Sequence, residues 1–504
     1  MVIADHGNLL FAFRSLFLKL PDKLQPLALE DNGFMLSSFL SRFTFPLLFI
    51  FAAAIEFCMV RISGITSLRN DFESLYWHFG IAFGIYLLTV LYVRFYWGKT
   101  FFSPEWIIGT AIVFRLTLLF SDPVLSDDIY RYIWDGRVSN HAVNPYAYAP
   151  ESGNLYGIRD SVIYPQINHK ELQTIYPPAA QVLFRITSWI SESVLAMKLM
   201  VLLFDIGIIF LIMALLRHFE LPLGWIAVYA WNPLAIIEFS GNGHMDAIGI
   251  FFMLLAFWFS LREKTILSAL PLALSFCTKY LTLPLLPFME DIRSRWKNVL
   301  AITAIFAGTV LLLYTGYSDV DAIKFGSLKI FSETWEFNAS LYTVVENFFK
   351  TRLDSSLTTV WGISTDNPAR LAARLTIGIS LTLFIMILYG INFTKSYAVQ
   401  TKRRIYYAFL IIAAILIVSP TVHPWYVIWI IPFLCFYPNP AWVLFTGLVF
   451  MSYDTLVGSL FGAHWYERPE IKLWQYIPFY AVMIIHFTWY LIRKFQSHPG
   501  EPVA

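Results

Sequence analysis

The stretch TILSALPLALSFCTKYLTLPLLPFM (265–289) decides how the chain is threaded, because one lysine stands at the middle of an otherwise apolar run. Three prolines also interrupt the run, and proline cannot continue a regular helix. We therefore predict two half-helices with a break near Thr278 and Lys279. The chain would then enter and leave the stretch on one side, whereas a single span would invert every element that follows.

The composition indicates an integral membrane protein. Of the 504 residues, 58% are hydrophobic and only 14% are charged, whereas soluble domains have about 45–50% apolar and about 25% charged residues. The formal net charge of +2 gives no reason to expect a nucleic-acid partner. We expect an all-α, multi-pass protein in which membrane lipids surround most of the chain.

Apolar runs long enough to cross a membrane recur along the chain, and we expect about 12 to 14 transmembrane or half-membrane helices in total. Besides the broken stretch, the spanning candidates are 43–60, 76–97, 105–120, 194–216, 222–240, 245–261, 297–315, 371–393, 405–419, 424–437, 441–458 and 474–492.

These runs divide the chain into segments. The expected segments are an N-terminal amphipathic or cytoplasmic segment (1–42), N-terminal transmembrane helices (43–120), a first extracytoplasmic loop with an acidic motif (121–193), a transmembrane core (194–315), a second extracytoplasmic loop (316–370), C-terminal transmembrane helices (371–493) and a cytoplasmic tail (494–504).

Basic residues predict the orientation. The connection 394–404 carries one arginine pair and two lysines without any acid, and the connection 291–297 is also basic, so both are expected on the cytoplasmic side. The opposite face then receives the remaining polar segments, which are the insertions 121–190 and 316–370, the strings GNGHMD (241–246) and VHPWY (422–426), and Lys279. We interpret this gathering of polar segments at one face as an active site.

The string SDDIYRYIWDGRV (126–138) directly follows an apolar run. With Ser126 as N-cap, Asp127 and Asp128 occupy the first turn of a helix, where carboxylates are favoured. Helix capping and a surface ion pair would also explain these acids. Acids beside a lipid-facing run are costly unless they face a cavity, which favours a functional role. A carboxylate at such a place suits general-base work on a hydroxyl.

Later positions of the same helix share a face with Asp128. Arg131 or Tyr132, and then Asp135, follow at spacings of three and four residues. We predict that this face contributes to substrate binding.

The string WNPLAIIEFSGNGHMDAIG (231–249) places Glu238, His244 and Asp246 around a glycine-rich turn. A histidine at a helix start is often only an exposed cap, so this is the main alternative to binding sugar hydroxyls or phosphate. The spacing is not a recognised metal motif. No cofactor is therefore expected, although a divalent metal stays open.

Other polar residues interrupt apolar or aromatic segments. Lys279 requires an anion unless it reaches up to the interface, and a phosphate head group would supply one. HPWY (423–426) suits either interfacial anchoring or contact of His423 with phosphate or sugar. SETWEFNASLYTVVENFF (332–349) combines acids, an amide and aromatics, a composition suited to carbohydrate.

The sequence offers no cradle for a soluble nucleotide. GNGHMDAIG (241–249) lacks the glycine spacing of dinucleotide-binding motifs and opens no strand-to-helix unit. A sugar donor would therefore carry a leaving group that a membrane chain can reach, and a lipid-linked phosphate fits.

Five strings together carry a family resemblance. They are SDDIYRYIWDGRV with NPYAYAP, TIYPPAAQVLF, WNPLAIIEFSGNGHMDAIG, CTKYLTLPLLPF and HPWYVIWIIPFL. Over residues 105–435 the chain resembles the polytopic glycosyltransferases of the GT-C fold. It is similar in particular to polyprenol-phosphate-mannose-dependent mannosyltransferases, both the bacterial enzymes and those that act on GPI anchors.

The resemblance implies that Asp127 or Asp128 is the catalytic base and that the donor is a sugar on polyprenyl phosphate, transferred outside the cytoplasm. KYLTLP (279–284) is similar to a Lys-Ile-Tyr-Pro string of the GPI enzymes but lacks the adjacent proline. With the clusters above, the candidate substrate- or phosphate-binding residues are Arg131, Tyr132, Asp135, Asn144, Tyr176, His244, Asp246, Lys279, Tyr280, Glu333, Asn338, His423, Trp425 and Tyr426.

The sequence therefore predicts a hexosyltransferase, with mannose favoured by the resemblance, that acts by inverting displacement on a lipid, glycan or other extracytoplasmic acceptor. A bacterial inner membrane is the expected location. The main alternative is a transporter or flippase of lipid-linked or small polar solutes, because Arg115, Asp205 and Lys279 lie in apolar runs. A third is an assembly subunit with a degenerate site.

Overall fold

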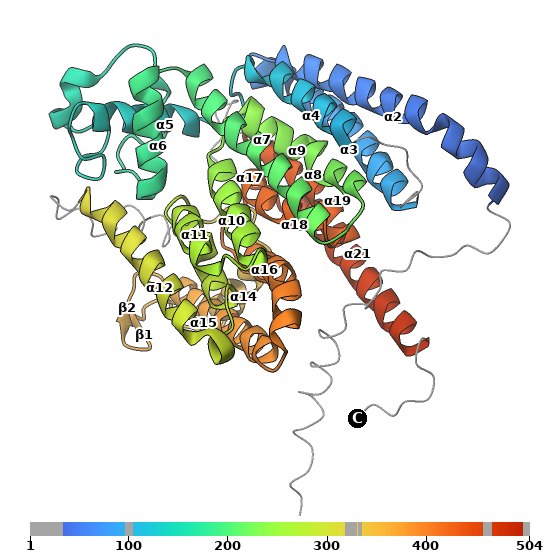
Figure 1. Ribbon diagram of the computed structural model, residues 1–504. Helices are drawn as coiled ribbons and strands as arrows, with labels where there is room; N and C mark the ends of the chain where they lie inside the picture. The colour runs from blue at the N-terminus through green and yellow to red at the C-terminus, as the bar shows by residue number, and fades with distance from the viewer. Residues whose placement is uncertain (1–33, 96–103, 318–329, 331–334, 457–465, 497–504) are drawn as a thin grey trace, which may run out of the picture.

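Helices form nearly all of the computed structural model, which describes residues 34–95, 104–317, 330, 335–456 and 466–496 (Figure 1). Residues 1–33 of the expected N-terminal amphipathic or cytoplasmic segment lie outside the described residues. The longer helices are α2 (Phe34–Ser63), α3 (Leu68–Phe95), α4 (Pro104–Leu119), α5 (Asp128–Asn140), α6 (Pro178–Ile190), α7 (Val194–His218), α10 (Asp246–Leu261), α12 (Ile292–Thr315), α14 (Leu341–Lys350), α15 (Pro368–Phe393), α16 (Tyr397–Val418) and α21 (Pro469–Gln496).

Shorter elements connect these helices. They are α8 (Ala227–Ala230), α9 (Pro233–Ile236), α11 (Ala269–Phe276), α17 (Pro424–Val427), α18 (Ile431–Leu434), α19 (Pro440–Leu448), a π-helix (Ile237–Gly241), 3-10 helices at Gly153–Ile158, Tyr164–Gln166, Leu223–Ile226, Thr265–Ser268, Tyr280–Phe288, Ile428–Ile430 and Val449–Tyr453, and the hairpin of β1 (Thr359–Val360) and β2 (Ile363–Ser364).

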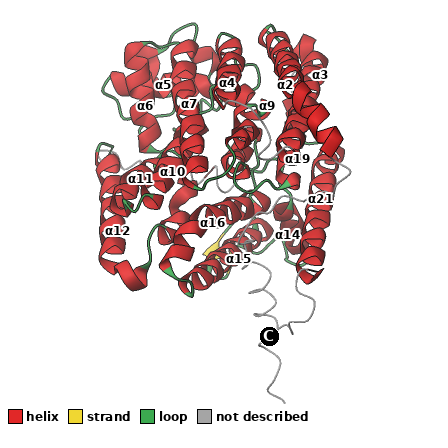
Figure 2. Ribbon diagram, turned by 45° about the vertical axis from the view of Figure 1, so that its right-hand side comes forward, coloured by secondary structure: helices red, strands yellow, loops and turns green. Residues whose placement is uncertain are grey.

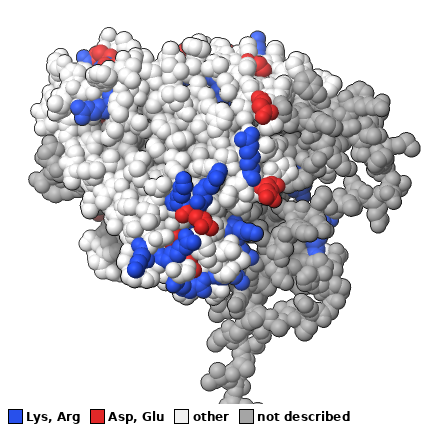
Figure 3. All heavy atoms as spheres, viewed as in Figure 1, with Lys and Arg blue, Asp and Glu red and all other residues white. Residues whose placement is uncertain are grey.

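The structure confirms an all-α membrane protein. Within the described ranges, five helices are long and apolar enough to cross a membrane, and these are Pro46–Ser63, Leu68–Phe95, Val194–His218, Ile292–Thr315 and Pro368–Phe393. Figure 3 shows that most of one face carries neither acid nor base, as a surface in contact with lipid requires.

The expected spans 222–240 and 245–261 form a single bent unit. Short helical pieces end in the π-helix Ile237–Gly241, and the chain then turns by 118° into α10. Gly243 lies in the turn with φ +75°, a conformation that glycine adopts without strain. The bend places a polar turn between two apolar segments.

The predicted break in 265–289 is present. Helix α11 ends at Phe276, and Lys279 has extended backbone with φ −153° and ψ 125°. The second half, Tyr280–Phe288, is a 3-10 helix rather than an α-helix. Pro284 and Pro287 lie inside it, and each removes a backbone donor that an α-helix needs.

The first insertion is held together by packing of α5 on α6 and by a buried arginine. Arg137 donates to Asp160 at 2.9 Å and to Glu192 at 2.8 Å. The hydrogen bond from Arg137, with those from the Tyr164 and Ile163 backbone, lowers the pKa of Asp160 to about 2. Tyr132 of α5 stacks on Phe184 of α6 with ring centroids 4.6 Å apart. The insertion is therefore a folded cap on the membrane helices.

One ion pair is closed within the helix core. The Arg115 guanidinium on α4 donates to the Asp205 carboxylate on α7 at 2.6 Å, and Tyr229 donates to the same carboxylate at 2.7 Å. The side chains of Arg115 and Asp205 are fully buried. This pair therefore satisfies the two intramembrane charges on which the transporter alternative partly relied.

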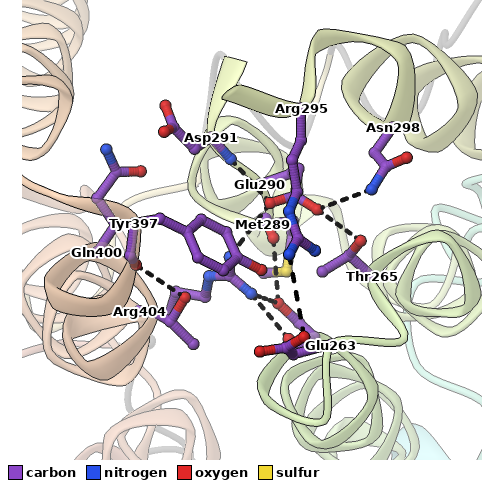
Figure 4. A network of polar contacts seen from close by, with 12 residues as sticks. Glu263, Thr265, Met289, Glu290, Asp291, Arg295, Asn298, Tyr397, Gln400 and Arg404 are labelled. Carbon is purple, nitrogen blue, oxygen red and sulfur yellow. Dashed lines mark hydrogen bonds and ion pairs between the residues drawn. The ribbon is translucent and has the colours of Figure 1, made fainter. Parts of the chain in front are cut away.

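A second polar network joins the basic connections (Figure 4). Arg404 on α16 donates to Ser260 at the end of α10 and lies 3.6 Å from Glu290. The Arg293 guanidinium bonds the Lys395 carbonyl, which brings the two connections together. In both overall views, α15 and α16 lie away from α5 and α6 (Figures 1 and 2).

The α5–α6 contact gives a test of the cap. A Cβ at Gly136 would lie 2.4 Å from the Phe184 carbonyl oxygen, so Gly136→Ala forces the two helices apart. We expect a loss of about 1–3 kcal/mol in unfolding free energy, measured as a lower melting temperature in detergent. Gly157→Ala is the matched control, because nothing lies within 4 Å of its added Cβ. Equal melting temperatures for both variants would contradict this packing.

Candidate active site

Asp128 begins α5 and points toward the bend between the π-helix and α10. Its Oδ1 accepts a hydrogen bond from Asn168 at 3.0 Å, and its Oδ2 lies 3.9 Å from Nδ1 of His244. The Asp128 side chain is 22% exposed, so a substrate can reach it. Burial raises the pKa of Asp128, and the Asn168 hydrogen bond and the charge of Lys279 offset part of this rise.

The two chain breaks meet at an ion pair. The Lys279 ammonium, at the break of 265–289, donates to Oδ1 of Asp246 at 2.5 Å, and Asp246 begins α10 just after the bend. Trp429 donates its indole N–H to the same oxygen at 2.6 Å. Lys279 also lies 3.6 Å from the ring centroid of Tyr426, a cation–π contact.

A column of rings forms one wall of this cluster. His244 stacks on Trp425 with centroids 3.9 Å apart, and Trp425 stacks on His423 at 4.3 Å. Phe337, from the second insertion, stacks on the other side of His423 at 4.5 Å. The column therefore joins the bend, the start of α17 and the second insertion.

Seven of the sequence-predicted residues come together in this cluster. They are Asp128, His244, Asp246, Lys279, His423, Trp425 and Tyr426. Asp127, by contrast, has an exposed side chain. The substrate contacts of all these residues stay predictions.

Arg131 and Asp135 pair with each other at 2.9 Å. The Arg131 guanidinium also donates to the Leu172 carbonyl, and Asp135 accepts from Gln181 at 2.9 Å. In this conformation both side chains tie α5 to the rest of the first insertion. Tyr132 makes an edge contact with Tyr176, with ring centroids 5.0 Å apart.

Three further candidates make bonds elsewhere. Asn144 donates to the Tyr317 carbonyl at 3.0 Å, and the Tyr280 hydroxyl bonds the Tyr314 hydroxyl at 2.7 Å. Asn338 is buried at φ +50°. Its backbone N–H donates to Glu467, and its side-chain amide donates to Gln475. Glu333 lies outside the described residues.

Sequence analysis did not single out three donors to the cluster carboxylates. Asn168 donates to Asp128, Trp429 to Asp246 and Tyr453 to Glu238, the last at 2.6 Å. Asn168 stands in a loop without periodicity, and the other two lie in apolar runs that resemble ordinary spans. No local signal marks them, because their roles depend on contacts between distant parts of the chain.

The cluster combines a partly exposed carboxylate, a lysine and a ring wall at the edge of an apolar bundle. Such a site can remove a proton from a hydroxyl and stabilise negative charge on a departing phosphate. Within the described ranges, no group of three His, Cys, Asp or Glu side chains is arranged to hold a metal ion.

Two protein-family models match the chain. The alpha-(1->6)-mannopyranosyltransferase N-terminal domain matches residues 52–294, and glycosyltransferase family 87 matches residues 174–420. No curated protein and no solved structure matches significantly. Fold and family matches together define a membrane glycosyltransferase. The chain is, more particularly, similar to the mannosyltransferases of the first family and to glycosyltransferase family 87, which agrees with the expected GT-C fold.

The ion pair at the chain breaks yields a stability prediction. Lys279→Met or Asp246→Asn leaves the partner poorly satisfied, so each single variant lowers the melting temperature, and the double variant loses less than their sum. We expect a coupling energy of about 0.5–3 kcal/mol. The more exposed pair Arg295–Glu263, with side chains 34% and 68% exposed, is the matched control, with a coupling of about 0–1 kcal/mol. Strict additivity at Lys279 and Asp246 would contradict the pairing.

Proposed function

We propose that the protein transfers a hexose from a polyprenyl-phosphate donor to a hydroxyl of a lipid or glycan acceptor. The observation that carries this proposal is the position of Asp128, a partly exposed carboxylate beside Lys279 at the edge of an apolar bundle. A lipid-borne donor can enter from the membrane, and a water-soluble acceptor group can approach from the folded first insertion.

The geometry favours Asp128 over Asp127 as the base. Asp128 faces His244 and the Lys279–Asp246 pair, and Asn168 fixes its carboxylate. Asp127 is exposed, and the positive groups that act on it are Lys170 and His169 rather than Lys279. The acceptor hydroxyl attacks the anomeric carbon while Asp128 takes its proton, and the phosphate leaves with the electrons of the broken bond. A single displacement of this kind inverts the anomeric centre.

Lys279 is suited to hold the departing phosphate. Its side chain is 23% exposed, although Asp246 already accepts from its ammonium. The ammonium has three donors, so pairing with Asp246 leaves donors for a phosphate oxygen. Tyr426 lies against the Lys279 ammonium, and His423 of the ring column makes an edge contact with Tyr426. The phosphoester supplies the free energy of transfer, so the proposal requires neither ATP nor a redox cofactor.

Mannose is the first sugar to test, because the family that matches residues 52–294 is named for α-(1→6)-mannopyranosyl transfer. Two features support an extracytoplasmic site. The site and the Arg404 network lie at opposite ends of α10, whose 16 residues span about 24 Å. Basic connections favour the cytoplasm, which leaves the site on the outer side, in a bacterium the periplasmic side of the inner membrane.

The base assignment gives a direct test. Purified protein in lipid is incubated with radiolabelled polyprenyl-phosphate mannose, glucose or arabinose and an acceptor-lipid extract. Asp128→Asn should lower transfer about 100-fold to 10,000-fold, because an amide cannot take the proton. Asp127→Asn, the neighbouring control, should keep most of the activity. Full turnover by Asp128→Asn would overturn the assignment, and solute movement without transfer would favour the transporter alternative.

The environment of Asp128 gives a pH prediction. The base must be ionised, and burial raises its pKa, so kcat/KM should fall on acidification at a pH above the ordinary aspartate pKa of about 3.9. Asn168→Ala removes a hydrogen bond to the charged form and should move this acid limb to higher pH. Asn154→Ala, on an exposed part of the same insertion, should not move it. If Asn168→Ala leaves the acid limb of the kcat/KM profile at the same pH, the assignment of that limb to Asp128 is contradicted.

A further inference from the structure

Glu238 is a fully buried acid that the proposed transfer step does not use. It lies on the π-helix Ile237–Gly241, an element often found at functional sites. Its carboxylate accepts from Tyr453 at 2.6 Å and from Asn242 at 3.3 Å. In the described part of the chain, no Lys or Arg pairs with it, and the side chain that can form an ion pair with it is His244.

His244 lies between this acid and the proposed base. Its Nε2 is 3.4 Å from Oε2 of Glu238, and its Nδ1 is 3.9 Å from Oδ2 of Asp128. The side chain is 1% exposed, and neither ring nitrogen makes a hydrogen bond of full geometry. Stacking on Trp425, with an interplanar angle of 14°, fixes the ring plane. One nitrogen is thereby aimed at each carboxyl group.

This order of groups has a chemical consequence. Neutral imidazole has one N–H donor and one acceptor nitrogen. A hydrogen bond from Nε2–H to Glu238 leaves the Nδ1 lone pair facing Asp128. Catalytic hydrogen bonds are often long before substrate binds and tighten in the complex, so the gap of 3.9 Å is compatible with proton transfer on substrate binding.

Because of the charges around His244, its imidazolium form requires the carboxyl groups of Glu238 and Asp128. Burial of the ring is the largest effect that opposes an imidazolium at His244, and Lys279 and His423, which also face it, oppose it further. Asp246 neutralises Lys279 through their 2.5 Å contact. An imidazolium at position 244 is therefore stabilised only when Glu238 and Asp128 flank it as carboxylates.

We infer that His244 is a positioning residue that stores the proton removed by Asp128, and that Glu238 sets its tautomer. The inference rests on the proposed function. As the new glycosidic bond forms, the acceptor's proton moves to Oδ2 of Asp128 and then to Nδ1 of His244, so Asp128 regains its carboxylate. The imidazolium gives the proton to the released polyprenyl phosphate or to water when the products leave.

The test is a double-mutant cycle on kcat with His244→Gln, Glu238→Gln and the double variant, in lipid with the donor panel above. Each single variant should lower kcat about 100-fold with little change in the donor KM. Because the residues act as a unit, the double variant should be no slower than His244→Gln alone. His141→Gln is the control, since this exposed histidine bonds only a carbonyl of its own helix among the contacts described.

If His244 and Glu238 have a purely structural role, the double-mutant cycle gives different results. Lower melting temperatures with additive losses in kcat, or losses confined to KM, would overturn the inference, as would wild-type kcat in His244→Gln. In those cases Asp128→Asn still lowers transfer about 100-fold to 10,000-fold, and the proposed function stands. If the wild-type protein transfers no hexose from any donor, the proposed function and this inference fail together.

Discussion

The ion pair between Lys279 and Asp246 is the interaction on which the fold and the site both depend. Each residue lies at a place where an apolar segment is broken, one within 265–289 and the other at the 118° bend. An unpaired charge at either break would be costly beside lipid. The two breaks must therefore meet at the same depth, and their meeting creates the polar floor of the site.

Exposure separates this pair from the other buried charges. Arg115 and Asp205 are fully enclosed, and Arg404 with Glu290 is nearly so. Those pairs join helices to one another and leave no access for a ligand. Lys279, in contrast, remains partly exposed. This partial exposure is what the proposed binding of a phosphate at Lys279 requires.

Sequence patterns predicted the elements whose causes are local. Apolar run length gave the long spans, and a lysine with nearby prolines gave the break at 265–289. The glycine-rich turn at 241–246 was predicted between two separate spans, and the structure has a 118° bend there within one broken unit. The π-helix Ile237–Gly241 before it was not predicted, because it follows an apolar run whose composition fits an ordinary span. The spacing of Arg131 and Asp135 indicated that they share a helix face and can pair. Their further bonds, to the Leu172 carbonyl and to Gln181, depend on how the first insertion folds.

The gathering of polar residues could be predicted, but not their individual partners. Asp128, Lys279 and His423 were assigned to one face from the threading of the chain. Asn168 and Tyr453 reach the cluster through contacts between parts of the chain that are far apart in sequence. Local patterns in one sequence do not predict such contacts.

The most direct measurement of the central claim is cysteine labelling from each side of the membrane. Ser161→Cys in the first insertion and Lys402→Cys in the basic connection are both exposed, whereas the native cysteines are buried. In sealed vesicles of known orientation, an impermeant maleimide should label position 161 only from the extracytoplasmic side and position 402 only from the cytoplasmic side. Labelling of both positions from one side would contradict the account.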